Sequence, residues 1–519
     1  MKREATLCIL VALVAAAVLL HPSVFGLGEV LPGGDRAYGQ AWGAWSIGRD
    51  VALDGEVALA GWPVLLTIRA LDLVLPLAVA TTLAVLGWLA AGGVVAYLAV
   101  RDISRPGAVG AALICGANPA LLEGVADGRY EWLVVPWVVA ALSRRPGWVA
   151  LGLAGAAAHS PLLGLATAIL ATIPALARSW RAGAATLAAG ALFTGLSAWP
   201  HRALTDLPVA EAPLNAFANA GDFLEPFFAW REDAVTPGVA LWLVLAGGAW
   251  LLWKRRLDAG LAVAFAVGLV LALGTELYWG GGTVRVLQRP VPMPASIVQA
   301  LLPDHPLLTW KSALVPAMVA GGLALAPLRR WGLAVASVVF LAGALEPIGA
   351  TDARMPRAVE QLAGGEGPVL HLPVATEGHN LRALWFQTAH GRPLVTPMGA
   401  MTSSELLGDP LVVLAVNAEV QEPRHAIPDR HAKTMLMTLG VREVLLHRDD
   451  ADLGSLVLLD QLLGSQLGSP QRDLVGEVDV YRLPSGHGGE EPEVVGFQEP
   501  RDPPAGWLRP QDWLEKYGS

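Results

Sequence analysis

The sequence has little charge and almost no cysteine. Charged residues make up 16% of its 519 residues, whereas a soluble protein usually carries about 25%. Hydrophobic residues reach 54%, and the mean hydropathy is +0.49. Such a shortage of charge over so long a chain excludes an ordinary cytosolic enzyme and a disordered protein, and it predicts a polytopic membrane protein. The net charge of -9 gives no reason to expect nucleic acid as a partner.

The two cysteines, Cys8 and Cys115, both lie inside apolar runs. Neither is placed to form a disulfide in an aqueous domain, and no CxxC or Cys/His spacing indicates a zinc site. Residues 350–519 also lack GxSxG and HExxH, the motifs of common secreted hydrolases. These absences exclude several catalytic classes without naming one.

Apolar segments near the length of a membrane span recur through the first two thirds of the chain. A spanning helix needs about 20 apolar residues, and the sequence predicts about eleven such helices. The candidate spans lie near 5–22, 73–100, 107–122, 131–143, 148–158, 161–177, 183–200, 238–253, 258–275, 309–328 and 331–348. The first follows a basic start and lacks a convincing cleavage site, so we interpret it as an uncleaved helix; a removed signal peptide is the alternative.

Basic residues decide how these spans are oriented. With the N-terminus in the cytoplasm, the inner segments are rich in lysine and arginine: Lys2, Arg3, Arg101, Arg105, Arg144, Arg145, Arg178, Arg181, Lys254, Arg255, Arg256, Arg329 and Arg330. The outer loops, 21–73, 123–131, 201–236 and 276–308, contain more acidic than basic residues. This positive-inside pattern requires the chain to turn at residues 159–161. One long kinked helix over 148–177 is the alternative, and it would change the parity.

The composition changes after residue 349. The sequence predicts a membrane domain over 1–349, an extracytoplasmic α/β domain over 350–483, and a tail rich in Gly, Pro and Glu over 484–519. Short β-like runs lie at 369–372, 442–447 and 478–483, and helix-like stretches lie at 406–419 and 453–467. With eleven spans, the second domain lies outside the cytoplasm.

Ionisable residues gather in the outer loops, while the spans are almost free of charge. Proton- or ion-coupled transporters keep such groups at mid-membrane depth, and no convincing inverted repeat is present. The pattern therefore favours a site at the outer membrane surface over a transport path, and it disfavours a lipid or glycan flippase.

The first outer loop contains Gly33 and Gly34, which allow a tight turn that presents Asp35 and Arg36. Trp42 and Trp45 follow at a spacing that places them on one face of a short helix, and we expect that helix to lie at the membrane interface. The alternative for Asp35 is a helix cap.

Other candidate site residues lie in the later outer loops. Asp127, Arg129 and Glu131 fall between two short spans and are suited to bind an anionic head group or to position a sugar; a solvated turn is the alternative. Further candidates are Asp222, and the basic Arg285, Arg289 and Lys311, which suit a lipid-linked phosphate. For Lys311, a lysine at a helix end whose side chain reaches the interface is the alternative.

Taken in order along the chain, these features resemble the GT-C class of bacterial membrane glycosyltransferases, including the branch of YfhO-type proteins. The resemblance rests on an acidic motif after the first span, on Asn118-Pro119 with Asp127-Gly128-Arg129-Tyr130, and on a proline-rich segment at 291–303 before a late span. An outer domain containing 369–373, 387–393 and 439–444 follows. The chain departs from the pattern in two places: Arg36 stands where some relatives have a second acid, and Lys311 where arginine is usual.

The resemblance implies transfer of a sugar from a polyprenyl-phosphate donor to a glycan, lipid or protein acceptor at the outer face of a bacterial cytoplasmic membrane. It assigns Asp35 as the catalytic base or a metal ligand. From their place in the outer loops, we expect the substrate-binding residues to be Arg36, Asp127, Arg129, Glu131, Asp222, Arg289 and Lys311. A divalent metal fits this chemistry but is not required. The rival hypothesis is a non-catalytic assembly or scaffold protein of the same fold, whose outer domain binds a partner.

Overall fold

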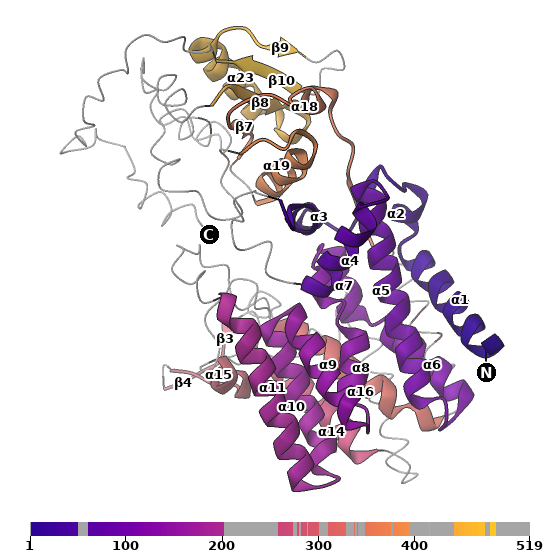
Figure 1. Ribbon diagram of the computed structural model, residues 1–519. Coiled ribbons are helices and arrows are strands. Elements are labelled where there is room, and N and C mark those ends of the chain that lie inside the picture. The colour runs from indigo at the N-terminus through magenta and orange to yellow at the C-terminus, as the bar shows by residue number, and fades with distance from the viewer. Residues whose placement is uncertain are drawn as a thin grey trace. The chain divides into compact units, whose positions relative to one another are not determined.

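In a computed structural model of the protein, the chain divides into two compact units (Figure 1). The described residues are 2–49, 61–201, 246, 258–272, 278–279, 282–287, 289–299, 310–328, 337, 340, 348–374, 377–394, 415, 441–472 and 478–483. The first unit holds most of residues 1–353, and the second holds residues 354–519 with the short segments 49–54 and 207–212. The predictions for 202–236, 406–414 and the tail 484–519 lie outside the described residues, as does almost all of the spans at 238–253 and 331–348.

The first unit is built from helices that follow the predicted apolar segments. They are α1 (Lys2–Leu19), α5 (Leu77–Val100), α6 (Arg105–Gly116), α7 (Pro119–Ala126), α8 (Val135–Ala141), α9 (Pro146–His159), α10 (Pro161–Leu176), α11 (Trp180–His201), α14 (Ala259–Ala272) and α16 (Leu314–Ala324). Among the described residues, α5 and the stretch Arg105–Ala126 are long and apolar enough to cross a membrane, and several helices are shorter. The total of about eleven spans stays a prediction.

The chain turns sharply between α9 and α10, as the distribution of arginines requires. Ser160 is extended, with φ -165° and ψ 142°, and it separates the two helices. A Cβ on Gly164 would lie 2.7 Å from the Cα of Ala157. These two positions are equally far from the break, so the helices run antiparallel as a hairpin. The prediction of a turn is confirmed, and the single kinked helix is excluded.

Basic residues meet at the end of this hairpin that lies away from the turn. Arg178 Nη1 donates to the carbonyl oxygen of Arg144 at 3.1 Å. Arg144 Nη2 in turn lies 3.5 Å from a carboxylate oxygen of Asp258, at the start of α14. The requirement that Arg144 and Arg178 share one side of the unit is therefore met, whichever side of a membrane it faces.

The first predicted outer loop is a folded segment. It contains α2 (His21–Phe25), β1 (Val30–Pro32), α3 (Arg36–Ser46) and α4 (Trp62–Asp72). Strand β1 pairs antiparallel with β6 (Ala350–Asp352). The first unit therefore runs to residue 353 rather than ending at 349, because β6 is held by β1.

Helix α3 is a core helix, and the prediction that it lies at an interface is wrong. Trp42 is fully buried and Trp45 is 8% exposed. Every residue from Ala37 to Ser46 is buried. The spacing of the tryptophans correctly places them on a helix, but protein packs around the whole of that helix.

Short elements complete the first unit. The hairpins β2 (Tyr278–Trp279) with β3 (Gly282–Thr283) and β4 (Arg285–Val286) with β5 (Arg289–Pro290) precede α15 (Pro294–Gln299). The described residues of this unit also include the 3₁₀ helices η1 (Tyr130–Trp132), η3 (Trp310–Ala313) and η4 (Ala326–Leu328).

The second unit contains a four-stranded mixed sheet with helices. Its elements are α18 (Arg357–Glu360), β7 (Val369–Leu372), α19 (Glu377–His390), β8 (Glu443–His447), η5 (Arg448–Asp450), α23 (Leu453–Leu467), β9 (Gln471–Arg472) and β10 (Val478–Arg482). The strand order is β7-β8-β10-β9, with β7 parallel to β8 and β10 antiparallel to both of its neighbours. The strands predicted at 369–372, 442–447 and 478–483 and the helix predicted at 453–467 are confirmed.

Three buried histidines lie together in this unit. His371 on β7 and His447 on β8 join through ring nitrogens 2.8 Å apart. His390, at the end of α19, stacks on His371 with ring centroids 5.5 Å apart, and Phe386 stacks on His447 at 4.5 Å. The nearby cations are themselves paired, Arg382 with Asp450 and Arg392 with Glu443.

Burial keeps these imidazoles neutral. It lowers the pKa of His447 to about 3, helped by the positive charge of Arg382. It lowers the pKa of His390 to about 4, helped by Arg392. The pKa of His371 is also lowered from its ordinary value of 6.5, by burial first and then by the neighbouring histidines and Arg392.

The second unit should therefore lose stability in acid. The unfolded chain takes up protons on these histidines near pH 6.5, while the folded chain resists protonation until about pH 4. The free energy of unfolding should be constant above that window and fall as the pH falls through it. Hydrogen exchange of β7 and β8 amides in the full chain, at about pH 7.5 and about pH 5 with intrinsic rates corrected, measures this.

A His447→Gln variant is the control, because glutamine offers hydrogen-bonding groups but does not titrate. It should narrow the difference in protection between the two pH values. Equal protection of the unmodified chain at both values would contradict the prediction.

Candidate functional site

The site begins with two backbone turns that touch. Gly33 has φ +101°, and a Cβ there would lie 2.2 Å from the carbonyl oxygen of Val125. Gly128 has φ +76°, and a Cβ there would lie 2.3 Å from a backbone nitrogen of the 33–37 turn. Only glycine tolerates both the conformation and the contact. The 33–37 turn therefore lies directly on the 125–128 turn.

Hydrogen bonds on both sides hold this contact in place. Gly34 N donates to the carbonyl oxygen of Ala126 at 2.7 Å. The hydroxyl of Tyr130, fully buried, donates to the carbonyl oxygen of Pro32 at 2.7 Å. On the other side, Thr351 donates to the carbonyl oxygen of Gly33 at 2.5 Å. The two turns are thus tied both to each other and to β6.

The contact brings two arginines to one carboxylate. Arg129 Nε lies 2.5 Å from Asp127 Oδ2, and Arg36 Nε lies 3.8 Å from the same oxygen. The three side chains are partly exposed, at 16% for Arg129, 29% for Arg36 and 54% for Asp127. Asp127 therefore faces two guanidinium groups, the side-chain type that binds phosphate oxygens most directionally.

Asp35 stands at the rim of the same contact. It occupies the N-cap position of α3, but its side chain makes no cap hydrogen bond, and its backbone is already helical, with φ -57° and ψ -28°. By contrast, Asn118 caps α7 by accepting from Ala120 N. Asp35 is exposed, and no hydrogen bond or ion pair with another described residue engages its carboxylate. The capping alternative is therefore not supported.

Glu131 lies beneath this surface. It is 3% exposed, and Gln40 Nε2 on α3 lies 3.5 Å from its carboxylate. His159 Nδ1 donates to the Glu131 backbone carbonyl at 3.1 Å, and Gly61 N donates to the His159 carbonyl at 2.7 Å. Glu131 is thus enclosed by α3, by the residue before α4 and by the α9–α10 turn.

Gln40 and His159 are site residues that the sequence did not predict. For His159 a signal was present: the turn at 159–161 was assigned to the same side as 123–131, which puts its imidazole within reach of that loop. For Gln40 no signal was available, because one polar residue in an otherwise small and apolar helix does not show which partner it faces.

The remaining predicted residues do not join this cluster in the described structure. Arg289 is exposed on β5, and no interaction among the described residues links it to Asp35 or Asp127. Lys311 lies on η3, which packs against α7, and its side chain is outside the described residues. Asp222 is also outside them. In the described parts of the chain, no group of three or more His, Cys, Asp or Glu side chains is arranged to hold a metal ion.

The fold is GT-C-like, because it resembles that of a solved arabinofuranosyltransferase. The chain is similar to the cryo-EM structure of the arabinofuranosyltransferase AftD from Mycobacteria, with a TM-score of 0.56 and 16% identity over 93% of this chain and 40% of that one. A mutant form of AftD gives a TM-score of 0.54, again at 16% identity and 93% of this chain, with 42% of that one. The chain therefore spans less than half the length of AftD.

A third solved structure is similar to the chain only at a lower TM-score. The archaeal oligosaccharyltransferase AglB from Archaeoglobus fulgidus, solved with an inhibitory peptide and a dolichol-phosphate, gives a TM-score of 0.41 at 13% identity, over 93% of this chain and 74% of that one; at that score the likeness carries no argument. No protein-family model matches the sequence, and no curated protein matches it.

Substitution of Gly128 by alanine should open the contact between the two turns. A side chain at positive φ costs about 1 kcal/mol or more, and at Gly128 the added Cβ also meets backbone atoms at 2.3 Å. Gly48→Ala is the matched control, because Gly48 has φ +74° and a Cβ added there would meet nothing within 4 Å. Thermal unfolding of the detergent-solubilised chain should show a larger loss for Gly128→Ala; equal losses would show that the contact is not tight.

Proposed function

We propose that the protein is a membrane glycosyltransferase that moves a sugar from a polyprenyl-phosphate donor to an acceptor at the outer face of a bacterial cytoplasmic membrane. The observation that carries the proposal is the position of Asp35. Its carboxylate is exposed and makes no hydrogen bond or ion pair with another described residue, at the turn that also carries Arg36, in a GT-C-like fold.

The proposed reaction assigns separate tasks to these groups. The acceptor hydroxyl oxygen forms a bond to the anomeric carbon while the bond from that carbon to the donor phosphate breaks. The polyprenyl phosphate leaves with the bonding electrons, and Asp35 takes the hydroxyl proton. Arg36 and Arg129 bind the phosphate and stabilise its growing charge. No step in this scheme passes through a metal.

The remaining groups have supporting tasks in this proposal. Asp127 holds the two arginines side by side, so that their guanidinium groups face the same ligand. Glu131, enclosed by Gln40 and by the α9–α10 turn, fixes the base of the site. Arg289, Lys311 and Asp222 are retained as donor-binding candidates from the sequence alone.

We also propose that the chain crosses the membrane several times with its N-terminus in the cytoplasm, that its second domain is extracytoplasmic, and that it belongs to the YfhO-like branch. AftD is an arabinofuranosyltransferase by name, but neither its sugar nor its acceptor is transferred here, since this chain covers only part of it.

Replacing Asp35 with asparagine should abolish glycan transfer. Asparagine has nearly the same shape but cannot take a proton, and loss of a general base typically costs about 10²–10⁴-fold in rate. Because the Asp35 side chain makes no cap hydrogen bond, the variant should insert into the membrane and unfold at the same temperature as the parent chain. Transfer of radiolabelled sugar by membranes from a deletion strain carrying each variant measures the activity.

Glu29→Gln is the matched control, because Glu29 is another exposed carboxylate in the same 21–73 segment. It should leave transfer unchanged. Full transfer by Asp35→Asn would exclude the catalytic assignment and favour the rival hypothesis, an assembly protein whose second domain binds a partner. In that case a stable partner should co-purify with the full chain and be lost when residues 354–519 are deleted.

A further inference from the structure

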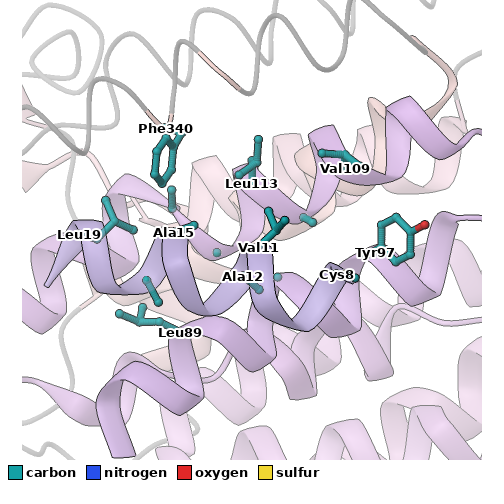
Figure 2. A pocket seen from close by; sticks show the side chains of 15 residues that line it. Cys8, Val11, Ala12, Ala15, Leu19, Leu89, Tyr97, Val109, Leu113 and Phe340 are labelled. Atoms are coloured by element: carbon teal, nitrogen blue, oxygen red, sulfur yellow. The ribbon is translucent and has the colours of Figure 1, made fainter. Parts of the chain in front are cut away.

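A groove lies between α1, α5 and α6, away from the proposed catalytic site. Its volume is about 300 Å³. Figure 2 shows side chains from the three helices pointing into it, with Phe340 at one end. Almost all of the lining is apolar: Cys8, Val11, Ala12, Ala15, Ala16, Leu19, Leu89, Gly93, Tyr97, Val109, Ala112, Leu113, Gly116, Ala117 and Phe340.

Small residues form the floor of the groove, and its mouth is open. Ala12, Gly93 and Ala112 leave space that larger side chains would fill, and a Cβ on Gly93 would already meet the carbonyl oxygen of Ala112 at 3.3 Å. Val11 lines the groove and is 48% exposed, and Val14 on the same helix is 56% exposed. In a membrane protein this surface faces lipid, so the groove opens to hydrocarbon rather than to water.

The length of the groove matches one leaflet of a bilayer. From Cys8 to Leu19, α1 rises about 16 Å at about 1.5 Å per residue. The hydrocarbon core of a bilayer is about 30 Å thick. A groove of this length takes one lipid tail from one leaflet, and it is too short for the long chain of an isoprenoid carrier.

One end of the groove carries a polar group, and a basic residue follows it by one helical turn. Cys8, Tyr97 and Val109 lie together at this end, and the Tyr97 hydroxyl is its polar group (Figure 2). Arg101 follows Tyr97 by one helical turn, and its backbone N donates to the Tyr97 carbonyl oxygen at 2.9 Å. Arg101 is partly exposed, and the neighbouring Asp102 that it pairs with, at 3.8 Å, is almost fully exposed. Such a pair is weak in water and is readily exchanged for a lipid phosphate.

We propose that this groove binds one acyl chain of an anionic glycerophospholipid, whose head-group phosphate is bound by Arg101. The apolar lining takes the chain, the Tyr97 hydroxyl donates to an ester carbonyl, and the guanidinium group gives the preference for negative charge. This lipid is structural rather than a reactant, and the inference does not depend on the proposed glycosyl transfer.

Native mass spectrometry of the full chain tests the proposal. The detergent-purified protein is delipidated and incubated with phosphatidylglycerol or with phosphatidylcholine of the same acyl chains. The parent chain should retain one phosphatidylglycerol in preference to phosphatidylcholine. Ala112→Leu and Ala12→Leu fill the groove from α6 and from α1, and each should lose retention of both lipids.

The Arg101→Gln variant tests binding of the lipid head group separately from binding of the acyl chain. It should lower retention of phosphatidylglycerol about fivefold, the effect of removing one basic residue near a membrane surface, while phosphatidylcholine is retained as before. The matched control for the two groove-filling variants is Ala188→Leu. It makes the same change at an exposed position on α11 and should retain both lipids like the parent chain.

Three results would overturn the proposal. The first is equal lipid retention by Ala112→Leu, Ala12→Leu and Ala188→Leu. The second is equal retention of the two head groups by the parent chain. A polyprenyl phosphate bound in the groove instead, displaced by Ala12→Leu, would also exclude it and assign the groove to the donor.

Discussion

The close approach of two backbone turns is the constraint on which the site depends. Gly33 and Gly128 each lie at positive φ and each face backbone of the other turn at a distance that no side chain could occupy. This contact sets Arg36 against Asp127 and aims Asp35 outward. The hydrogen bond from Tyr130 to the Pro32 carbonyl extends the same arrangement to η1, so the position of Glu131 follows from it as well.

The α9–α10 hairpin links this site to the opposite end of the first unit. At the turn, His159 donates to the backbone of Glu131. At the far end, Arg178 and Asp258 both bind Arg144. The hairpin therefore joins a polar cluster with several carboxylates to a basic end through apolar helices, which is the separation of charge that a positive-inside orientation requires.

Hydropathy predicted the helices of the first unit well, because each must present apolar side chains along most of its length. Charge order along the chain predicted that the loops carrying Arg36, Asp127 and Arg129 share one side, and these three side chains do lie together. Packing partners could not be predicted in the same way. The spacing of Trp42 and Trp45 defines one helical face, but it does not distinguish a membrane interface from a protein core, and the core is what they occupy.

The three carboxylates of the cluster differ in what already surrounds them, and that difference bears on their roles. Asp127 pairs through Oδ2 with both guanidinium groups, so its carboxylate is tied to the arginines that are proposed to bind the phosphate. Glu131 is buried behind Gln40 and cannot reach a ligand at the surface without displacing α3. Asp35 has neither restraint, and its backbone is fixed by the glycine contact on one side and by α3 on the other. A general base must be both accessible and positioned, and only Asp35 among these three meets the two requirements, which is why the proposed role is assigned to it.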